Sequence, residues 1–419
     1  MMITQEALSL DNLDIIGPGH YQQHGYPHRE WAYLRAHDPV FWCEHPNTRP
    51  FWAITKHADI VWISRQPRLF LNGPRQQVFV YESGMKPGGK KPFRHLLDMD
   101  PPDHGEYRAI MSRYFTPRAI RKLQPTVEAI MNATLDALMD RTGCDFVRDV
   151  SAKIPLAVIA EMMGVPREDW ERLFRWTNEA IGGLDPEFQA GAAAPDTYER
   201  GRKGIFDYFA DLAARRVKNP TDDLASVVAN AKIGGAAIPR FEMLSYFYLL
   251  FIAGNETTRN ATTGGMLAFI ENPDEWNQLK RNPVAIKSAV EEILRWTSPV
   301  IQFARTAAED TEIRGRKIKA SESLCLFYPS ANRDEEVFVE PSRFSISRDP
   351  NPHLAFGIGE HFCLGAHLAR LELEVIFRAL AERMERIEQA GPVERLRSSF
   401  IGGIKHLPIR YRIRPAGAA

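Results

Sequence analysis

Hydrophobic and polar positions follow a helical period over most of this chain. Apolar residues return every three to four positions after residues that commonly start helices, which predicts amphipathic helices. Helices are expected to begin near His57, Pro102, Pro117, Ala152, Arg167, Thr197 and Pro239, and later ones to cover Pro273 to Lys280, Ala285 to Trp296 and Gly365 to Met384. The chain is therefore predicted to be mainly helical.

Strand patterns occupy smaller patches of the sequence. A short strand is expected at Phe51 to Thr55. Phe303 to Tyr328 alternates polar and apolar residues around the turn Arg314-Gly315-Arg316, and Phe400 to Ile413 predicts a terminal hairpin containing Gly402-Gly403. The sequence thus predicts an α+β fold, mainly α with a minor β part.

No repeat, low-complexity tract or Gly/Ser linker divides the sequence. Glycines and prolines are scattered between the helical segments, so we expect residues 1–419 to form a single domain. The stretch Ser83 to Pro92 is rich in glycine and lysine, which predicts a mobile loop.

Composition and charge narrow the classes of function. The chain has 53 basic and 53 acidic residues, so no basic surplus exists to bind nucleic acid, and 44% hydrophobic residues support a large core. Its four cysteines are far apart, which indicates a reducing compartment. The N-terminus lacks the cationic region of a signal peptide, and the most apolar run, Met243 to Ala253, is too short to span a bilayer. We therefore expect a cytoplasmic protein.

The expected helix from Pro239 to about Ile270 has an unusual interior. It contains Gly254, Gly264 and Gly265 together with the pair Thr257-Thr258, and each such glycine weakens a helix by roughly 1 kcal/mol. Close packing against another helix is one explanation, because glycine lets backbones approach. A site that needs space beside the helix is the other.

The segment Phe356 to Gly365 reads FGIGEHFCLG and is the most informative part of the chain. Its glycines surround Cys363 directly before an amphipathic helix, whose N-terminus is expected to lower the pKa of the thiol and stabilise a thiolate. Gly359 and Gly365 have no Cβ, so the backbone can approach a flat macrocycle closely. The pattern therefore predicts a metal-ligating cysteine.

Two alternatives remain for Cys363 from its residue type alone. A lone cysteine is commonly a small buried hydrophobic residue. A zinc site is the other alternative, with His353, His361, Cys363 and His367 as ligands, although this set has neither a C-x-x-C nor an H-x-x-x-H spacing.

The form F-x-x-G-x-H-x-C-x-G resembles the haem-binding loop of the cytochrome P-450 superfamily of haem-thiolate monooxygenases. The resemblance implies the fold of that family, with a long central helix over the haem and the cysteine loop beneath it. It also implies haem b as cofactor and Cys363 as the axial thiolate, which favours cleavage of the O–O bond. The loop residues Phe356, His361 and Gly365 are then expected beside the cofactor.

The sequence from Ala253 to Thr258, AGNETT, resembles the oxygen-activation motif of that family. The resemblance implies that Ala253 and Gly254 lie beside the haem and leave room for dioxygen. Glu256 and Thr257 are the candidate catalytic residues, because a carboxyl can relay protons and a hydroxyl can hold the oxygen or a water. The family commonly has aspartate where this chain has Glu256.

Two further groups of residues are assigned by the resemblance. His104 and Arg108 share one face of a helix at i, i+4 spacing, and the family's pattern makes them ligands of the haem propionates together with Arg305 and His361. Glu292 and Arg295 resemble the E-x-x-R motif, whose structural ion pair is expected to include Arg343.

The segments that line the substrate cavity in the family are mostly apolar here, which favours a small lipophilic substrate. The expected lining residues are Phe79, Phe247, Leu250, Val300, Ile301, Phe400 and Ile401, with the neighbouring segments Val78 to Tyr81 and Trp176 to Ile181. The segments at 253–260 and 330–334 are similar to those of bacterial enzymes that oxidise sterol side chains, branched lipids and monoterpenoids. We therefore expect hydroxylation of a C–H bond in a steroid, terpenoid or branched alkyl chain.

The chain has no G-x-G-x-x-G and no P-loop, so no site for a nicotinamide or flavin is evident. Similarity to soluble bacterial members implies that O2 is reduced with electrons from a ferredoxin and a ferredoxin reductase. The expected docking contacts are Arg113, Arg118, Arg121 and Lys122. A peroxide-driven peroxygenase and a non-catalytic haem- or zinc-binding sensor are the alternative functions.

Overall fold

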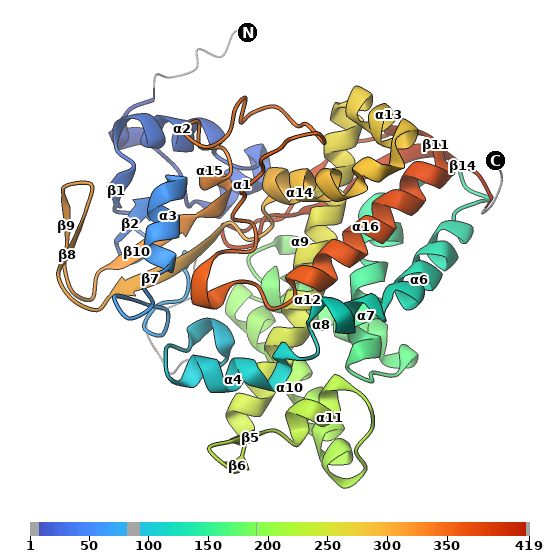
Figure 1. The fold of residues 1–419 in the computed structure, drawn as a ribbon, viewed down its shortest axis with the longest axis horizontal. Coiled ribbons are helices and arrows are strands. Elements are labelled where there is room, and N and C mark those ends of the chain that lie inside the picture. The colour runs from blue at the N-terminus through green and yellow to red at the C-terminus, as the bar shows by residue number, and fades with distance from the viewer. Residues whose placement is uncertain (1–7, 82–92, 190, 416–419) are drawn as a thin grey trace.

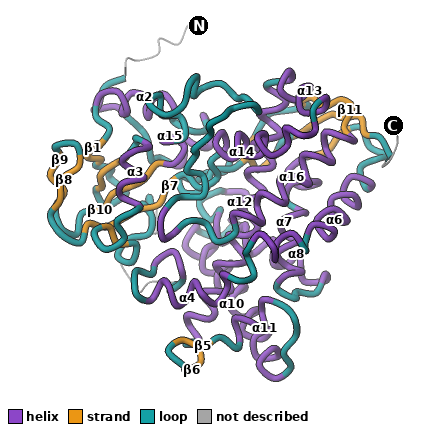
Figure 2. The backbone as a smooth tube through the Cα atoms, in the orientation of Figure 1, coloured by secondary structure: helices purple, strands orange, loops and turns teal. Residues whose placement is uncertain are grey.

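The computed structural model describes residues 8–81, 93–189 and 191–415, and helices form most of it (Figures 1 and 2). The helices are α1 Pro18–His24, α2 His28–His37, α3 His57–Ser64, α4 Asp103–Ser112, α5 Pro117–Arg121, α6 Gln124–Asp136, α7 Lys153–Met162, α8 Trp170–Ile181, α9 Pro186–Gln189, α10 Ala194–Lys218, α11 Leu224–Ala229, α12 Arg240–Glu271, α13 Pro273–Arg281, α14 Ile286–Thr297, α15 Tyr328–Ala331 and α16 Ala366–Arg383. Short helical turns are η1 Leu10–Asn12, η2 Leu96–Asp98, η3 Val147–Ser151, η4 Arg167–Asp169, η5 Pro283–Ala285 and η6 Gly359–His361.

The strands form small sheets beside the helices, as Figure 2 shows in orange. They are β1 Val40–Cys43, β2 Phe51–Ile54, β3 Phe70–Leu71, β4 Gly143–Asp145, β5 Lys232–Ile233, β6 Ala236–Ala237, β7 Gln302–Ala307, β8 Thr311–Ile313, β9 Arg316–Ile318, β10 Ser323–Phe327, β11 Met384–Gln389, β12 Glu394–Arg395, β13 Ile404–His406 and β14 Pro408–Ile413. The largest sheet has the order β1-β2-β10-β7-β3, and a second sheet has the order β11-β14-β4. The predicted α+β class is confirmed.

The predicted terminal hairpin is wrong. β13 pairs with β12, whereas β14 pairs with β11 and β4, so the two strands between Phe400 and Ile413 belong to different sheets. The expected strands at Phe51 to Thr55 and within Phe303 to Tyr328 are confirmed. The loop expected at Ser83 to Pro92 lies outside the described residues.

Helix α12 is the predicted long helix and crosses the middle of the molecule (Figure 1). It packs against α7, α10, α14 and α16, which bury most of its side chains. A Cβ at Gly265 would lie 2.8 Å from both Ile293 of α14 and Phe377 of α16. Gly264 and Gly265 therefore serve the close packing of helices, while the pocket described below lies farther toward the N-terminus of α12.

Candidate functional site

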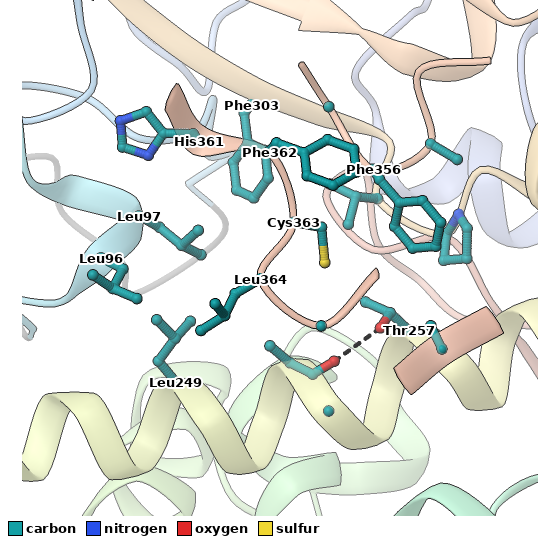
Figure 3. A pocket seen from close by; sticks show the side chains of 18 of the residues that line it. Leu96, Leu97, Leu249, Thr257, Phe303, Phe356, His361, Phe362, Cys363 and Leu364 are labelled. Atoms are coloured by element: carbon teal, nitrogen blue, oxygen red, sulfur yellow. Dashed lines mark hydrogen bonds between the residues drawn. The ribbon is translucent and has the colours of Figure 1, made fainter. Parts of the chain in front are cut away.

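One pocket lies between α12 and the loop that precedes α16 (Figure 3). Cys363 lines it from the loop, and its sulfur points toward α12, where Ala253, Gly254 and Thr257 line the opposite wall. Cys43, Cys144 and Cys325 are buried elsewhere and do not line this pocket. The structure therefore brings the predicted cysteine and the predicted central helix to one cavity.

Glycines shape the loop that carries Cys363. Gly357 and Gly359 have φ values of +65° and +79°, which residues with a Cβ rarely adopt, and a Cβ at Gly359 would lie 2.3 Å from the carbonyl oxygen of Ser64. The N–H of Cys363 donates to the carbonyl oxygen of Phe356 at 2.9 Å. This geometry turns the cysteine into the pocket and packs the loop tightly against α3.

The expected lowering of the Cys363 pKa is not what the structure shows. Burial raises the pKa of the thiol above its ordinary value, while the N–H of Gly365 and the charges of Arg108 and Arg370 act in the opposite direction. At the start of α16 the N–H of Gly365 donates to the sulfur, and it lowers the pKa by less than burial raises it.

Four basic side chains from distant segments line the same pocket. His104 and Arg108 come from α4, Arg305 from β7 and His361 from η6. The rings of His104 and His361 lie 4.2 Å apart between centroids, and the guanidinium of Arg108 donates to the carbonyl oxygen of Phe362 at 2.8 Å. The structure thus brings together the four residues that the sequence assigned to one anionic partner.

Two features of this cluster fit a cofactor with carboxylate groups. The Nε2 atom of His361 is buried without a hydrogen-bond partner in the described structure, and burial holds the pKa of His361 at about 2. Arg305 is buried, and no carboxylate of the described residues lies within ion-pair distance of it. A buried cation without a counter-ion is costly, so an anionic group at this place stabilises the cluster.

Thr257 and Glu256 lie on different sides of α12. Thr257 lines the pocket, and its hydroxyl donates to the carbonyl oxygen of Ala253 at 2.8 Å. Glu256 does not line the pocket and forms a buried ion pair with Arg259, which in turn donates to Asn178 of α8 at 2.8 Å. Burial raises the pKa of Glu256, and Arg259 opposes that shift. In this conformation only the alcohol of the predicted pair reaches the pocket.

The E-x-x-R pair is a fully buried ion pair. Arg295 donates to Glu292 at 2.7 and 2.8 Å, and both side chains are 0% exposed. The prediction of Arg343 as the third partner is wrong. The side chain of Arg343 is 60% exposed and pairs with Glu340. Arg348 contacts Glu292 instead, at 3.1 Å, because its segment turns back toward α14. Arg343 contributes only its carbonyl oxygen, which accepts a hydrogen bond from Arg295.

The predicted substrate residues are divided by the structure. Leu250 and Val300 line the pocket, whereas Phe79, Phe247, Ile301, Phe400 and Ile401 do not. Phe247 stacks on Phe209 in the helical core with ring centroids 5.0 Å apart, and Ile301 is completely buried in a second core cluster. The side chains of Phe247 and Ile301 therefore pack in the core and do not line the pocket.

Sequence reasoning missed several pocket residues. They are Asn72, Leu96, Leu97, Phe115, Leu249, Phe303 and Tyr328. Phe303 could have been found, because it is two residues from Arg305 on one strand and so shares its face. Leu249 follows from its neighbour Leu250, but Leu96 and Leu97 carry no signal in the sequence.

Glu372 of α16 is a further group that the sequence did not indicate. It is buried next to Leu368, Ala369 and Leu373, which line the pocket, and it forms no ion pair with the described residues. Burial raises the pKa of Glu372 to about 8, with the hydroxyl of Thr258 acting in the opposite direction. Burial therefore favours the protonated, neutral carboxyl.

The zinc alternative finds no support in the described part of the chain. His353 pairs with Glu291 at 3.0 Å, and His367 is exposed on α16. The group of potential metal ligands found among the described residues is Glu187, Glu394 and His406, which does not include Cys363.

Comparisons with known proteins agree with this site. Residues 213–397 match the family model described as cytochrome P450. The chain is 39% identical to the steroid C26-monooxygenase of Mycolicibacterium smegmatis, covering 92% of this chain and 90% of that protein. It is 33% identical to the linalool 8-monooxygenase of Pseudomonas putida, covering 96% and 99%. The solved structure of Mycobacterium marinum cytochrome P450 CYP268A2 in complex with pseudoionone has a TM-score of 0.88 at 33% identity, covering 97% of this chain and all of that one.

A cysteine loop that faces a long central helix across a pocket with four basic residues defines a haem-thiolate protein. The chain belongs to the cytochrome P450 family and is a monooxygenase that binds haem through a cysteine thiolate. Among the described helices, none combines the length and apolar character that a membrane crossing requires.

Proposed function

We propose that this chain inserts one oxygen atom of O2 into a C–H bond of a steroid, terpenoid or branched alkyl chain, with Cys363 as the axial thiolate of haem. The observation that carries the proposal is the placement of Cys363 and Thr257 on opposite walls of one pocket. When bound there, haem supplies the reductive activation of O2. Steroid C26-monooxygenase and linalool 8-monooxygenase, two relatives of this chain, support the substrate class.

The four basic residues hold the cofactor in this proposal. His104, Arg108, Arg305 and His361 bind its carboxylates, because the free Nε2 of His361 and the buried charge of Arg305 need anionic partners. Phe356 and Gly365 line the pocket on the cysteine side, and Ala253 and Gly254 line it on the side of α12. A Cβ at Gly254 would lie 3.1 Å from Ile159 of α7, so this glycine also lets α12 pack closely on α7.

Thr257 and Glu256 divide the proton transfer between them. Thr257 holds a proton-donating hydroxyl at the pocket wall, and Glu256 supplies protons from the buried side of α12. Glu256 must rotate away from Arg259 to reach the hydroxyl, because its carboxylate does not line the pocket in this conformation. Burial raises the pKa of Glu256, and separation from Arg259 would remove the charge that opposes this rise.

The pocket wall selects a neutral, lipophilic substrate. The apolar residues that line the wall beside α12 are Leu96, Leu97, Phe115, Leu249, Leu250, Val300 and Phe303. Such a wall excludes water and binds by shape. Orientation of the substrate then depends on the few side chains that fix the shape of this wall.

Ferredoxin and ferredoxin reductase supply the electrons in a cytoplasmic setting. Arg113, Arg118, Arg121 and Lys122 are exposed at the end of α4 and along α5, and α5 packs on the helix that follows Cys363. A cationic surface at this place favours an acidic partner. Reversal of charge at Arg118 should slow reduction of the haem at low salt, whereas Lys317→Glu on the distant β9 should not.

Turnover with labelled O2 tests the proposal. The purified haem-loaded protein is supplied with a bacterial ferredoxin, its reductase and either testosterone or linalool, and products are analysed by mass spectrometry. One labelled oxygen atom in an alcohol product is expected. Product formed with hydrogen peroxide alone, and none with the ferredoxin system, would instead assign a peroxygenase.

A further inference from the structure

A group of charged residues joins the connection between α8 and α10 to strand β13, far from the cysteine loop in the sequence. Asp185 and Glu187 lie in that connection, Lys405 and His406 lie on β13, and Asp145 ends β4. We call these five residues the ionic clamp. None of them lines the haem pocket.

The centre of the clamp is a buried ion pair. Lys405 Nζ lies 3.0 Å from Asp185 Oδ1, and the two side chains are 9% and 0% exposed. The second carboxylate oxygen of Asp185 accepts the N–H of Arg397 at 3.1 Å, which lies between β12 and β13. Asp185 therefore fastens the α8–α10 connection to both ends of this hairpin.

His406 extends the clamp toward solvent. Its Nε2 lies 3.0 Å from Glu187 Oε1 and its Nδ1 lies 2.5 Å from Asp145 Oδ2. Glu394 stands opposite His406 in the β12–β13 pairing, and its carboxylate joins Glu187 and His406 within 4.8 Å. Three carboxylates thus surround one imidazole.

Two charged groups on the elements packed against β13 are already paired. Arg148 of η3 pairs with Asp149, and Glu256 of α12 pairs with Arg259. Lys405 also contacts Glu187 at 2.9 Å. When His406 is neutral, Lys405 is the one cation left among the five clamp residues. It then faces the carboxylates of Asp145, Asp185 and Glu187 alone.

The hairpin held by the clamp reaches the pocket wall at its tip. The carbonyl oxygen of Phe400 accepts a hydrogen bond from the N–H of Ile301 at 2.9 Å. The N–H of Gly402 donates to the carbonyl oxygen of Pro299 at 2.8 Å. The ring of Phe400 lies 5.6 Å from that of Phe303, which lines the pocket together with Pro299. A shift of the hairpin therefore moves the wall on the substrate side.

We propose that His406 and Lys405 are positioning residues, and that the ionic clamp fixes the Phe400 hairpin against the pocket wall more firmly while His406 is protonated. The substrate role of that wall rests on the proposed function. The clamp itself rests on the ion pairs of His406 and on the buried Asp185–Lys405 contact.

The sign of the pH effect follows from the surroundings of His406. Burial lowers its pKa, but the hydrogen bonds to Asp145 and Glu187 outweigh burial and raise the pKa above its ordinary value. The charged imidazole is thus fully present below the ordinary value and is lost as pH rises through the raised one. The clamp is closed at acidic pH and loosens in mildly alkaline solution.

Hydrogen exchange on the haem-loaded full chain tests this inference between about pH 5.5 and about pH 8.5. After correction for the intrinsic pH dependence of exchange, protection in 182–189 and in 398–403 should fall together by roughly threefold to tenfold as pH rises. His406→Gln should give low protection at every pH, and His406→Lys should give high protection at every pH.

A matched control uses another histidine. His37 is exposed on α2 and bonds the carbonyl oxygen of Tyr33, so His37→Gln should behave as the unmodified chain does. Protection that does not change with pH, or a pH dependence that persists in His406→Gln, would overturn the clamp. If protection fell with pH in 182–189 but not in 398–403, the link between the ionic clamp and the pocket wall would be overturned. These readouts need no substrate, so they remain independent of the proposed reaction.

Discussion

Glu256 and Arg259 form a buried ion pair one helical turn apart on α12, with side chains only 1% and 7% exposed. Arg259 also donates to Asn178 of α8, so the acid is held toward α8 while Thr257 faces the pocket. The acid and the alcohol of the motif are neighbours in sequence but lie on two sides of the helix. Under the proposed function, proton delivery therefore requires the release of Glu256 from Arg259.

Arg259→Gln should destabilise the protein strongly. Removal of one partner leaves the other as an uncompensated buried charge, which typically costs about 3–5 kcal/mol in the free energy of unfolding. The double variant Glu256→Gln, Arg259→Gln should recover about half of that loss or more, because no buried charge remains. Urea denaturation of the single and double variants measures both values. Equal losses in the two would contradict a buried ionic pair.

Thr257→Ala should separate electron consumption from product formation. Without the hydroxyl at the pocket wall, protons are delivered poorly, and we expect the product formed per electron pair to fall by about tenfold or more. Thr257→Ser keeps the hydroxyl and should retain most of the coupling. Parallel assays of reductant use and product decide the point. Tight coupling in Thr257→Ala would exclude the proposed role.

Arg348 and Arg343 offer a matched pair for the structural ion network. Arg348 is mostly buried against Glu292, whereas Arg343 pairs with Glu340 at the surface. We expect Arg348→Gln to lower the free energy of unfolding by about 3 kcal/mol and Arg343→Gln by less than about 0.5 kcal/mol. Thermal unfolding of both variants tests this, and an equal effect would restore Arg343 as the third partner.

Glu372 predicts a pH dependence of stability. Its folded pKa of about 8 lies above the ordinary value, so its contribution is fully present below that ordinary value and is lost as pH rises through about 8. Glu372→Gln keeps a neutral side chain of the same size. The variant should match the unmodified chain at acidic pH and be more stable at alkaline pH, in denaturation series at several pH values. The same pH dependence in both proteins would show that Glu372 is not the cause.

The parts of the fold that the sequence predicted depend on local patterns. The length of α12 follows from a helical period that continues along one segment, while the turn at Gly359 and the i, i+3 pair Glu292–Arg295 each arise within a few residues. Periodicity, glycine chemistry and helix spacing are therefore sufficient to predict them. The cysteine loop belongs to the same class, since its glycines and its cysteine are contiguous.

The parts that the sequence mispredicted depend on distant partners. β13 and β14 are consecutive, yet one pairs with β12 and the other with β11 and β4, a choice that no pattern within 400–413 records. Arg348 replaces Arg343 because of how an irregular segment folds back on α14. Phe247 is apolar like Leu250, but the packing of α10 on α12 decides which of them faces the pocket.

The central claim is that Cys363 binds haem iron as a thiolate, and the absorption spectrum of the reduced protein under carbon monoxide tests it most directly. The account predicts the red-shifted Soret band that a thiolate ligand gives, and its loss in Cys363→Ser, while Cys325→Ser in the largest sheet keeps it. A red-shifted band that persists in Cys363→Ser, or no haem band in protein expressed with sufficient haem, would contradict the claim.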